Sequence, residues 1–444
     1  IPGGQPIAEM IDVVLKKFTD QQPWLIVPDL ISIRKKISTL PEGIWKDRKL
    51  AELNMLIRDC LGLYAELTAD HYFQSPGYRT TVAVEVINRS GFPVKLSRLK
   101  IENIKADSLV DKSLAKDTPL NFNLSGKLLS TLKTSEPYWL STSHPVGMFQ
   151  VQDENLITTP QNKPAIQGIF SFQVDAEFIE FSVPVLYKST DPVRGEVYRP
   201  VEITPAVALS FDQQVMLFPD LSTREINLTV RNLVAEKVSG NLRLEAPAGW
   251  QVSPAEINIS LKSRDDFHAV AVKISPPANA GAANLTGRFF MGEMSVQSGL
   301  KTIDYQHIPV QTLQPPANLR MVRNDVKIFG RRIGYIPGAG DEIPSALQSI
   351  GYTVTELNPG QFTEQSLAPY DAIVLGVRAL NVNQGLKTSM PLLLGYAEKG
   401  GTLVVQYNTN FELVADKFSP YELSISRERV TEEDSEIEIR LPDH

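Results

Sequence analysis

The chain has 444 residues, of which 42% are hydrophobic and 21% are charged, as in an ordinary soluble globular protein. At roughly 100 to 200 residues per domain, this length predicts three or four domains, each able to bury its own core. Because 51 acidic residues face 44 basic ones, the net charge of −7 argues against a nucleic-acid or anionic-membrane partner. No run of 18 apolar residues is present, so no membrane span is predicted.

The sole cysteine, Cys60, excludes an intrachain disulfide. A chain without disulfides is compatible with the cytoplasm and also with a large periplasmic protein. Cys60 falls on an apolar stripe, so we expect it to be a small buried hydrophobic residue. The chain begins Ile1-Pro2-Gly3 without a methionine, which indicates a fragment or a processed product whose signal peptide is out of sight.

The first predicted domain is a helical segment, residues 1–72. Apolar residues recur at helical spacing between Ile7 and Phe18, and a second, longer stripe runs from Leu50 to Leu67. These stripes predict helices over 5–70, punctuated by prolines.

Near residue 76 the apolar residues change from helical spacing to alternation with polar ones. This pattern predicts an Ig-like β-sandwich over 73–203. Its expected strands lie within 81–90, 92–103, 169–187 and 196–207.

A second β-sandwich is predicted over 204–314. The stretch 224–261 contains four strand-like runs, and 268–275 adds another. The proline-rich stretch that follows predicts a linker over 315–326.

The last domain, 327–444, alternates between strands and helices and predicts an open, mostly parallel, flavodoxin- or amidotransferase-like α/β sheet. Its continuously apolar runs are typical of strands buried on both faces. Strands are expected at 327–336, 353–357, 371–377 and 402–408, and helices at 342–351 and 387–401.

Two segments resemble known families. The pattern Val230-Arg231-Asn232, Val238-Ser239-Gly240, Pro247, Gly249-Trp250, Val252 and Pro254 resembles a β-sandwich attached to bacterial alpha-galactosidases. That resemblance implies an accessory module without a catalytic residue. The segments "YDAIVLGVRA" and "LLGYAEKGGTLVVQYNTN" resemble the type 1 glutamine amidotransferase-like superfamily, including its ThuA-like branch.

The order of the parts resembles the region downstream of the catalytic domain in large bacterial LmbE/PIG-L-type N-deacetylase proteins. The resemblance implies a periplasmic or secreted protein of glycan metabolism, with a glycan and an upstream zinc-dependent catalytic domain as partners. It implies that zinc is held only by that absent domain, so no cofactor is expected here. The ending at 440–444 suggests that more sheet follows, so we expect the α/β domain to be incomplete.

Catalytic motifs of these families are missing from the sequence. His144-Pro145 lacks the paired aspartates of a deacetylase loop, and the other histidines are scattered singly: His71, His268, His307 and His444. Where an amidotransferase needs a nucleophilic cysteine, the chain has Val377-Arg378-Ala379, and no G-x-S-x-G motif occurs. We therefore expect no catalytic residue and no metal site, and whether the parent protein is a hydrolase stays open.

A glycine-rich turn follows the strand predicted at 327–336. Ile343 replaces the third glycine of a dinucleotide fingerprint, and no P-loop lysine follows. Asp341 is expected to cap the next helix, with Pro344 in its first turn. Because two acids would repel a phosphate, a sugar or another polyol is the expected ligand, if any binds.

Residues that follow predicted parallel strands should share one edge of the sheet and form a crevice. The alternative role for Arg378 is an ion pair with Asp341 or Glu342. The candidate ligand-binding residues are Gly338, Gly340, Asp341, Glu342, Arg378, Asn381, Tyr407 and Asn408.

Three functions are left open by the sequence. The chain could be the accessory, non-catalytic part of a deacetylase-like protein; its α/β domain could itself act on or bind a sugar; or it could be a structural or interaction scaffold. Trp139 and Trp250 are candidate aromatic platforms for a sugar, although the motif around Trp250 favours a core position.

Overall fold

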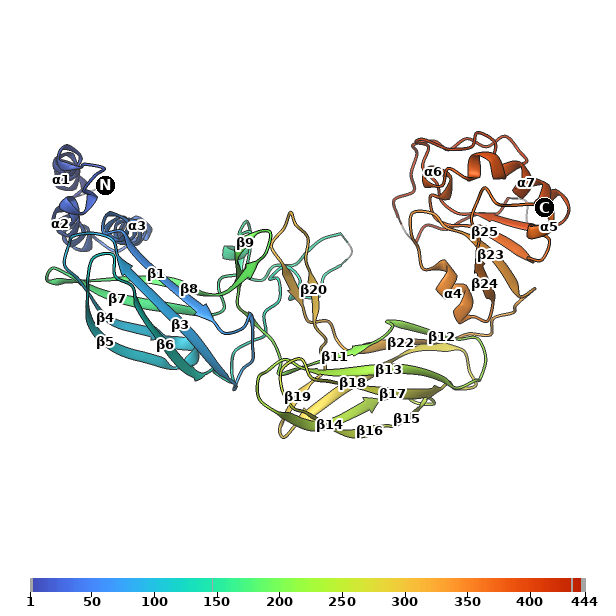
Figure 1. Ribbon diagram of the computed structural model, residues 1–444, viewed down its shortest axis with the longest axis horizontal. Coiled ribbons are helices and arrows are strands. Elements are labelled where there is room, and N and C mark those ends of the chain that lie inside the picture. Colours follow the sequence, from blue (N-terminus) through green and yellow to red (C-terminus); the bar gives the residue numbers. More distant parts are fainter. Residues whose placement is uncertain (1–2, 146, 433, 441–444) are drawn as a thin grey trace.

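The computed structural model describes residues 3–145, 147–432 and 434–440. Figure 1 shows three bodies in succession: N-terminal helices on a first β domain, a second β domain, and a small C-terminal domain with helices. Three features named in the sequence analysis lie outside the described residues: the start at residues 1–2, residues 441–444 of the ending, and His444. Among the described residues, no helix is long and apolar enough to cross a membrane.

The N-terminal helices are α1 (Gly4–Lys17), η1 (Pro23–Ile26), α2 (Val27–Ser38) and α3 (Ile44–Cys60). The prediction of helix up to residue 70 is wrong, because the chain turns at Gly62, which has a φ of 56°. Strand β1 (Leu63–Ala69) follows and pairs antiparallel with β3 (Arg79–Asn88). A spacing of four residues, as between Leu63 and Leu67, fits one face of a helix and one face of a strand equally well.

The first sheet is built around one long strand. Its order is β5-β4-β7-β8-β1-β3-β6, with β9 paired to β8, so β8 has partners in both halves of the sheet. The elements are β2 (Phe73–Gln74), β3 (Arg79–Asn88), β4 (Val94–Ile101), η2 (Glu102–Ile104), β5 (Ala106–Leu114), β6 (Leu120–Lys127), η3 (Glu154–Leu156), β7 (Gln167–Val174), β8 (Glu177–Asp191) and β9 (Gly195–Pro200).

The helices and the first sheet share one core. Ile57 of α3 and Leu30 of α2 belong to the same buried cluster as Leu67 and Phe170 of the sheet. An ion pair between Lys35 and Glu177 adds a contact at the surface. The predicted division into a helical segment at 1–72 and a separate sandwich is therefore wrong, because the apolar faces of the helices need the sheet to cover them.

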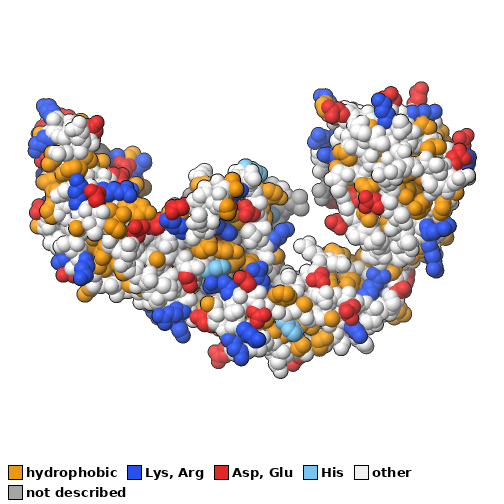
Figure 2. All heavy atoms as spheres, viewed as in Figure 1, with side chains coloured by type: hydrophobic (Ala, Val, Ile, Leu, Met, Phe, Trp, Pro, Cys, Tyr) orange, Lys and Arg blue, Asp and Glu red, His pale blue; other side chains and the backbone are white. Residues whose placement is uncertain are grey.

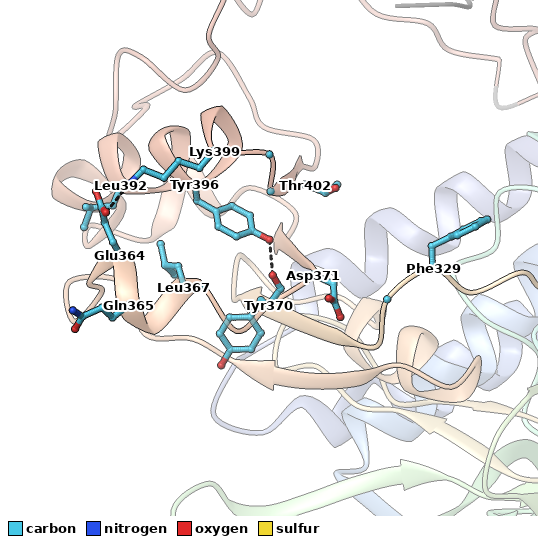
Figure 3. Close-up of a pocket in the computed structure, with 14 residues that line it drawn as sticks. Phe329, Glu364, Gln365, Leu367, Tyr370, Asp371, Leu392, Tyr396, Lys399 and Thr402 are labelled. Atoms are coloured by element: carbon cyan, nitrogen blue, oxygen red, sulfur yellow. Dashed lines mark hydrogen bonds and ion pairs between the residues drawn. The ribbon is translucent and has the colours of Figure 1, made fainter.

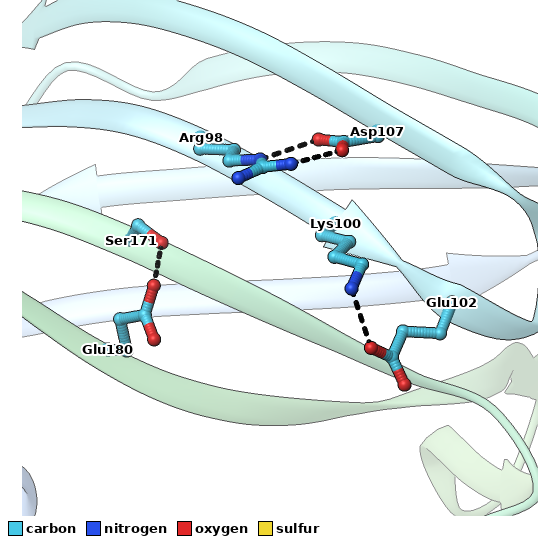
Figure 4. A network of polar contacts seen from close by, with 6 residues as sticks. All are labelled: Arg98, Lys100, Glu102, Asp107, Ser171 and Glu180. Atoms are coloured by element: carbon cyan, nitrogen blue, oxygen red, sulfur yellow. Dashed lines mark hydrogen bonds and ion pairs between the residues drawn. The ribbon is translucent and has the colours of Figure 1, made fainter.

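Polar pairs cross the exposed face of the first sheet, as Figure 4 shows. The guanidinium of Arg98 binds both carboxylate oxygens of Asp107 on the neighbouring strand, and the hydroxyl of Ser171 donates to Glu180. The hydrogen bonds from Arg98 lower the pKa of Asp107. Exposed ion pairs of this kind contribute little stability.

The second β domain is a sandwich of two sheets, β11-β13-β17-β15 and β12-β22-β18-β14-β16, with β19 paired to β18. Buried residues from both sheets, such as Leu228 and Phe289, form one core. The strands are β11 (Val207–Phe211), β12 (Val215–Phe218), β13 (Arg224–Asn232), β14 (Val238–Glu245), β15 (Gln251–Ser253), β16 (Glu256–Leu261), β17 (Phe267–Ser275), β18 (Gly281–Met291), β19 (Met294–Val296) and β22 (Asn318–Arg323).

The predicted linker at 315–326 is wrong over most of its length. Strand β22 occupies its middle and pairs with both β18 and β12. Leu319 and Met321 are buried in the sandwich. The two prolines at 315 and 316 precede this strand rather than interrupt it, so the connection to the last domain is 324–331.

A hairpin links the two β domains. It consists of β20 (Lys301–Ile303) and β21 (Gln311–Leu313). Just after it, the side-chain amide of Gln314 donates to the carbonyls of Ser135, at 2.7 Å, and Ile203, at 3.0 Å. The short strand β10 (Glu202–Ile203) pairs parallel with β2. The Thr204 N–H then donates to the Gln74 carbonyl at 2.9 Å, so the boundary predicted near residue 203 is crossed by a hydrogen bond.

The C-terminal domain has four parallel strands in the order β24-β23-β25-β26. One face packs against α4 and the other against α5, α6 and α7. The elements are β23 (Arg332–Ile336), α4 (Ile343–Ser349), β24 (Thr353–Glu356), α5 (Glu364–Leu367), β25 (Ala372–Leu375), α6 (Ala379–Val382), α7 (Leu386–Glu398) and β26 (Thr402–Val405).

Only the two central strands are buried as the apolar runs predict. Residues 333–336 of β23 and 373–375 of β25 are all buried. In β26, exposed and half-buried residues alternate, and Val404 is 42% exposed. The prediction of a fully buried strand at 402–408 is wrong because β26 is at the edge of the sheet and has no neighbour beyond β25.

Candidate functional site

The carboxyl ends of the parallel strands bring the predicted site residues together. The glycine turn follows β23, Arg378 lies just beyond β25, and Tyr407 and Asn408 follow β26. Backbone hydrogen bonds join the three loops: Ala339 N–H donates to the Val377 carbonyl at 2.8 Å, and Arg378 N–H donates to the Tyr407 carbonyl at 2.7 Å. The topological part of the site prediction therefore matches this edge of the sheet.

Asp341 ties these loops together instead of capping the helix alone. Its Oδ1 accepts from the Tyr335 hydroxyl at 2.7 Å and from the Ile343 N–H at 3.1 Å, while Oδ2 accepts from the Val377 N–H at 2.9 Å. The residue at the N-cap of α4 is Glu342, which makes no side-chain cap. The predicted cap is corrected to a clamp, because Asp341 lies one residue before the cap and faces the loop after β25.

The ionisation of this clamp follows from its bonds. Burial acts to raise the pKa of Asp341, but the hydrogen bonds from Val377, Tyr335 and Ile343 outweigh it, so the pKa lies below its ordinary value. Burial and the same carboxylate raise the pKa of the Tyr335 hydroxyl. An ionised Asp341 and a neutral Tyr335 thus form a stable donor–acceptor pair at neutral pH.

Two of the predicted polar side chains are likewise engaged with backbone. The Asn381 amide donates to the Phe411 carbonyl at 2.6 Å, and its oxygen accepts from the Thr409 N–H at 3.0 Å. Asn408 is buried, and its oxygen accepts from the Leu380 N–H at 3.0 Å. Both asparagines hold the loop after β26 against the loop after β25.

Arg378 occupies a constrained position. Its φ is 58°, a left-handed conformation that is uncommon for a residue with a side chain. Its guanidinium carbon lies 6.0 Å from the centre of the Tyr407 ring, and Tyr407 is 61% exposed. Within residues 3–145, 147–432 and 434–440, no ion pair joins Arg378 to Asp341 or Glu342, so the predicted pairing is replaced by a contact with an aromatic ring.

The two predicted glycines have different structural roles. A Cβ on Gly338 would lie 2.0 Å from the Val377 carbonyl oxygen, so only glycine allows the two loops to approach this closely. Gly340 has open space around it but a φ of 108°. Glu342 extends to the surface and accepts a hydrogen bond from Ser345 at 3.0 Å.

One hollow of this domain lies at the opposite edge of the sheet, where the strands begin (Figure 3). It has a volume of about 780 Å³ and lies between α5, α7 and the starts of β25 and β26. Its polar groups have partners: Asp371 accepts from the backbone of Arg331 and Arg332, and the Tyr396 hydroxyl donates to the Tyr370 carbonyl at 2.8 Å.

Ligands of open parallel sheets bind at the carboxyl ends of the strands. In this hollow Asp371 and Tyr396 bind backbone, and Glu364 pairs with Lys399, so we regard it as structural. The sequence carries no signal for it, because strand starts have no diagnostic residues.

The structure also places the other residues singled out in the sequence. Trp250 is 8% exposed and meets Phe218 edge-on at 5.1 Å, so its predicted core position is confirmed. Cys60 is buried as predicted, and burial raises the pKa of its thiol. Over the described part of the chain, no group of three or more His, Cys, Asp or Glu residues could hold a metal ion.

No family model matches the sequence, and no curated protein matches it. Among solved structures, the apo-form Calx CBD1 domain is 10% identical with a TM-score of 0.17, covering 27% of this chain and 98% of that one.

The native conformation of E. coli alpha-2-macroglobulin is 8% identical with a TM-score of 0.20, covering 59% of this chain and 17% of that one. The C. elegans protein SSP-19, an MSP-domain protein like family member, is 12% identical with a TM-score of 0.16, covering 26% and 97%. TM-scores this low carry no argument, and the β-sandwich architecture rests on the strand pairing described above.

Proposed function

We propose that this chain is the non-catalytic, multidomain part of a periplasmic or secreted LmbE/PIG-L-type deacetylase-like protein. Its β-sandwiches and its amidotransferase-like α/β domain would space and position an upstream zinc-dependent catalytic domain that acts on a glycan. The strand order β24-β23-β25-β26 supports the α/β part of this proposal, because the order of the parallel strands reverses between β23 and β25, as in doubly wound folds.

The observation that carries the proposal is the state of the carboxyl-end loops. Asp341, Asn381 and Asn408 all form hydrogen bonds with backbone groups or with Tyr335. A catalytic carboxylate needs at least one oxygen free to reach substrate. The loops therefore behave as scaffold, and Arg378 stands where an amidotransferase would carry its nucleophile.

The surface of the N-terminal helices supports a positioning role. Leu15 of α1 is 68% exposed, and Ile44 and Trp45 of α3 are 80% and 58% exposed. An apolar hollow of about 530 Å³ lies between these two helices. Exposed apolar surface of this kind is typical of contacts with another domain. Figure 2 shows charged side chains of both signs scattered over the rest of the visible face.

The proposal is tested by assaying the purified chain for acetyl release from N-acetylglucosamine and for glutamine hydrolysis, each with and without added zinc. We expect neither activity. Zinc-dependent acetyl release that disappears in a His144→Ala or His307→Ala variant would contradict the proposal.

A second function, sugar binding by the α/β domain, is favoured by one observation. Tyr407 is exposed beside Arg378, so an aromatic ring and a cation lie together at the edge where ligands of such sheets bind. Loss of sugar binding on Tyr407→Ala would support this function over a pure scaffold.

A further inference from the structure

The joint between the two β domains contains a cavity that belongs to none of the sites above. It has a volume of about 240 Å³ and is lined by the loop around Trp139, by residues 161–165, by the middle of β8, by β9 and β10, and by β21 of the hairpin. This volume is below the roughly 300 Å³ at which sites for drug-sized ligands begin. A ligand of this cavity would therefore be small, about the size of one sugar ring.

The walls combine an aromatic ring, prolines and a few polar groups. Trp139 is half-buried, and Pro164, Pro184 and Pro200 contribute aliphatic rings. The polar side chains Lys163, Glu202 and Gln311 share the lining. Ligand sites are typically apolar cavities with a small number of polar groups that fix the orientation of the ligand.

One buried hydroxyl at the cavity has no partner. Thr312 lines the cavity and is only 3% exposed, yet its Oγ1 makes no hydrogen bond to any described residue. A buried polar group without a partner is unfavourable, and such groups in folded proteins are nearly always satisfied. Thr312 thus leaves an unsatisfied hydroxyl in the wall of the cavity, which an occupant reaches after a small movement of that wall.

Trp139 is held in place by its neighbours. The Tyr138 ring meets it edge-on at 4.9 Å, and the Tyr138 hydroxyl donates to the Thr159 carbonyl at 3.0 Å. Asn162 accepts from the Tyr138 N–H at 2.9 Å and donates to the Glu136 carbonyl at 2.6 Å. An aromatic platform that is already ordered loses little entropy when a ligand stacks on it.

The charges of the cavity favour a neutral ligand with hydroxyl groups. The lining contains Glu136 and Glu202 but only one cation, Lys163, so its ionisable groups do not favour an anion. Burial raises the pKa of Glu202, an effect that the nearby Ser135 hydroxyl and Arg199 only partly offset. A carboxyl, an amine, an amide and a hydroxyl can each exchange hydrogen bonds with sugar hydroxyls.

We propose that this cavity is a binding site for a single neutral sugar residue, with its ring stacked on Trp139 and its hydroxyls bonded to Thr312, Gln311 and Glu202. The site is separate from the α/β domain and does not depend on the proposed non-catalytic role. Because the wall comes from both β domains, a bound sugar would also fasten the first domain to the hairpin of the second.

The test is calorimetric titration of the whole chain with glucose, galactose and N-acetylglucosamine, each up to 50 mM. We expect at least one of them to bind. Thr312→Val keeps the shape and removes the hydroxyl, and should weaken that binding about threefold to tenfold; Trp139→Ala should weaken it at least tenfold. Phe267→Ala is the matched control, an exposed aromatic residue of the second sandwich, and should bind as the wild type does, while Tyr407→Ala tests the α/β edge.

Absence of binding for all three sugars would overturn the proposal. So would wild-type affinity in both Trp139→Ala and Thr312→Val, or a loss of binding confined to Tyr407→Ala. If Trp139→Ala fails to fold, Thr312→Val alone decides. Acetyl release is not measured in this test, so a failure here leaves the proposed non-catalytic role untouched.

Discussion

The carboxyl-end loops of the α/β sheet and the cavity at the joint of the β domains both contain polar side chains, but these differ in whether they have hydrogen-bond partners. At the sheet edge, Asp341 accepts three hydrogen bonds and both asparagines are bonded to backbone. At the joint, the hydroxyl of Thr312 is buried without a partner, and Trp139 forms part of an open wall. The first arrangement stabilises the domain, and we propose that the second takes a ligand.

The contrast teaches that polar residues after parallel strands do not by themselves make a binding site. What matters is whether their donors and acceptors are free once the chain has folded. At the sheet edge the nearest partner of Asp341 is Tyr335, six residues earlier and on the strand itself. That contact fills the place that a ligand hydroxyl would otherwise take.

The largest expected effect separates the two tryptophans proposed as sugar platforms. Trp250→Ala should destabilise the second sandwich by about 3 to 5 kcal/mol, because it empties a buried position against Phe218. Trp139→Ala should cost much less stability and act on binding instead. Calorimetric melting of both variants measures the difference in stability. Equal losses of stability in the two variants would mean that Trp139 is as much a core residue as Trp250.

The next effect separates the two neighbouring acids of the glycine turn. Asp341→Ala leaves the Tyr335 hydroxyl and the Val377 N–H without their acceptor, so we expect a loss of about 2 to 3 kcal/mol. Glu342→Ala is the matched control and should change stability by less than about 0.5 kcal/mol. Urea unfolding of the α/β domain, followed by hydrogen exchange, measures both. If the two losses were equal, Asp341 would be no clamp.

The pH dependence of the two regions should have opposite signs. The folded-state pKa of Asp341 is lowered, so its stabilisation is present above the unfolded value of about 3.9 and disappears as the pH falls through the folded pKa. The folded-state pKa of Glu202 is raised, so its contribution is present below the unfolded value and is lost as the pH rises.

Substitution by the neutral amide should reveal these signs. At pH 7, Asp341→Asn should destabilise the chain and Glu202→Gln should stabilise it, and both differences should shrink below about pH 4. Thermal melting from pH 3 to pH 8 measures the two curves. Parallel curves would mean that the two carboxyl groups have similar surroundings.

Much of the architecture could be predicted from the sequence, and the misses have physical causes. The strands at 332–336 and 372–375 were predictable because central parallel strands are apolar without interruption. Strand β1 was missed because the spacing of Leu63 and Leu67 satisfies both periods. Strand β22 was missed because two prolines precede it, although its buried alternation of Leu319 and Met321 could have indicated a strand.

The location of the candidate site could be predicted from the sequence, but the hydrogen bonds of its side chains could not. Gly338, Asp341, Arg378 and Tyr407 could be placed at one edge because each follows a parallel strand. That Asp341 would bond to Tyr335 and Val377 depends on the packing of separate loops, which no local pattern encodes. The cavity at the joint draws its lining from segments between residues 135 and 312, and only Trp139 drew notice in the sequence.

The smallest expected effect concerns the strained turn after β25. Arg378→Gly relieves a φ of 58°, at the cost of a more flexible unfolded chain, so we expect a gain of only about 0.5 kcal/mol. Urea unfolding measures this change. A loss of stability instead would mean that the contact between Arg378 and the Tyr407 ring outweighs the backbone strain.

The most direct test of the contrast between the two regions is a crystal of the whole chain soaked in the sugar that binds most tightly. The account predicts one sugar ring against Trp139, within hydrogen-bonding distance of Thr312, and none beside Asp341, Arg378 and Tyr407. A ring at the carboxyl ends of the α/β strands, with the joint cavity filled only by water, would contradict it.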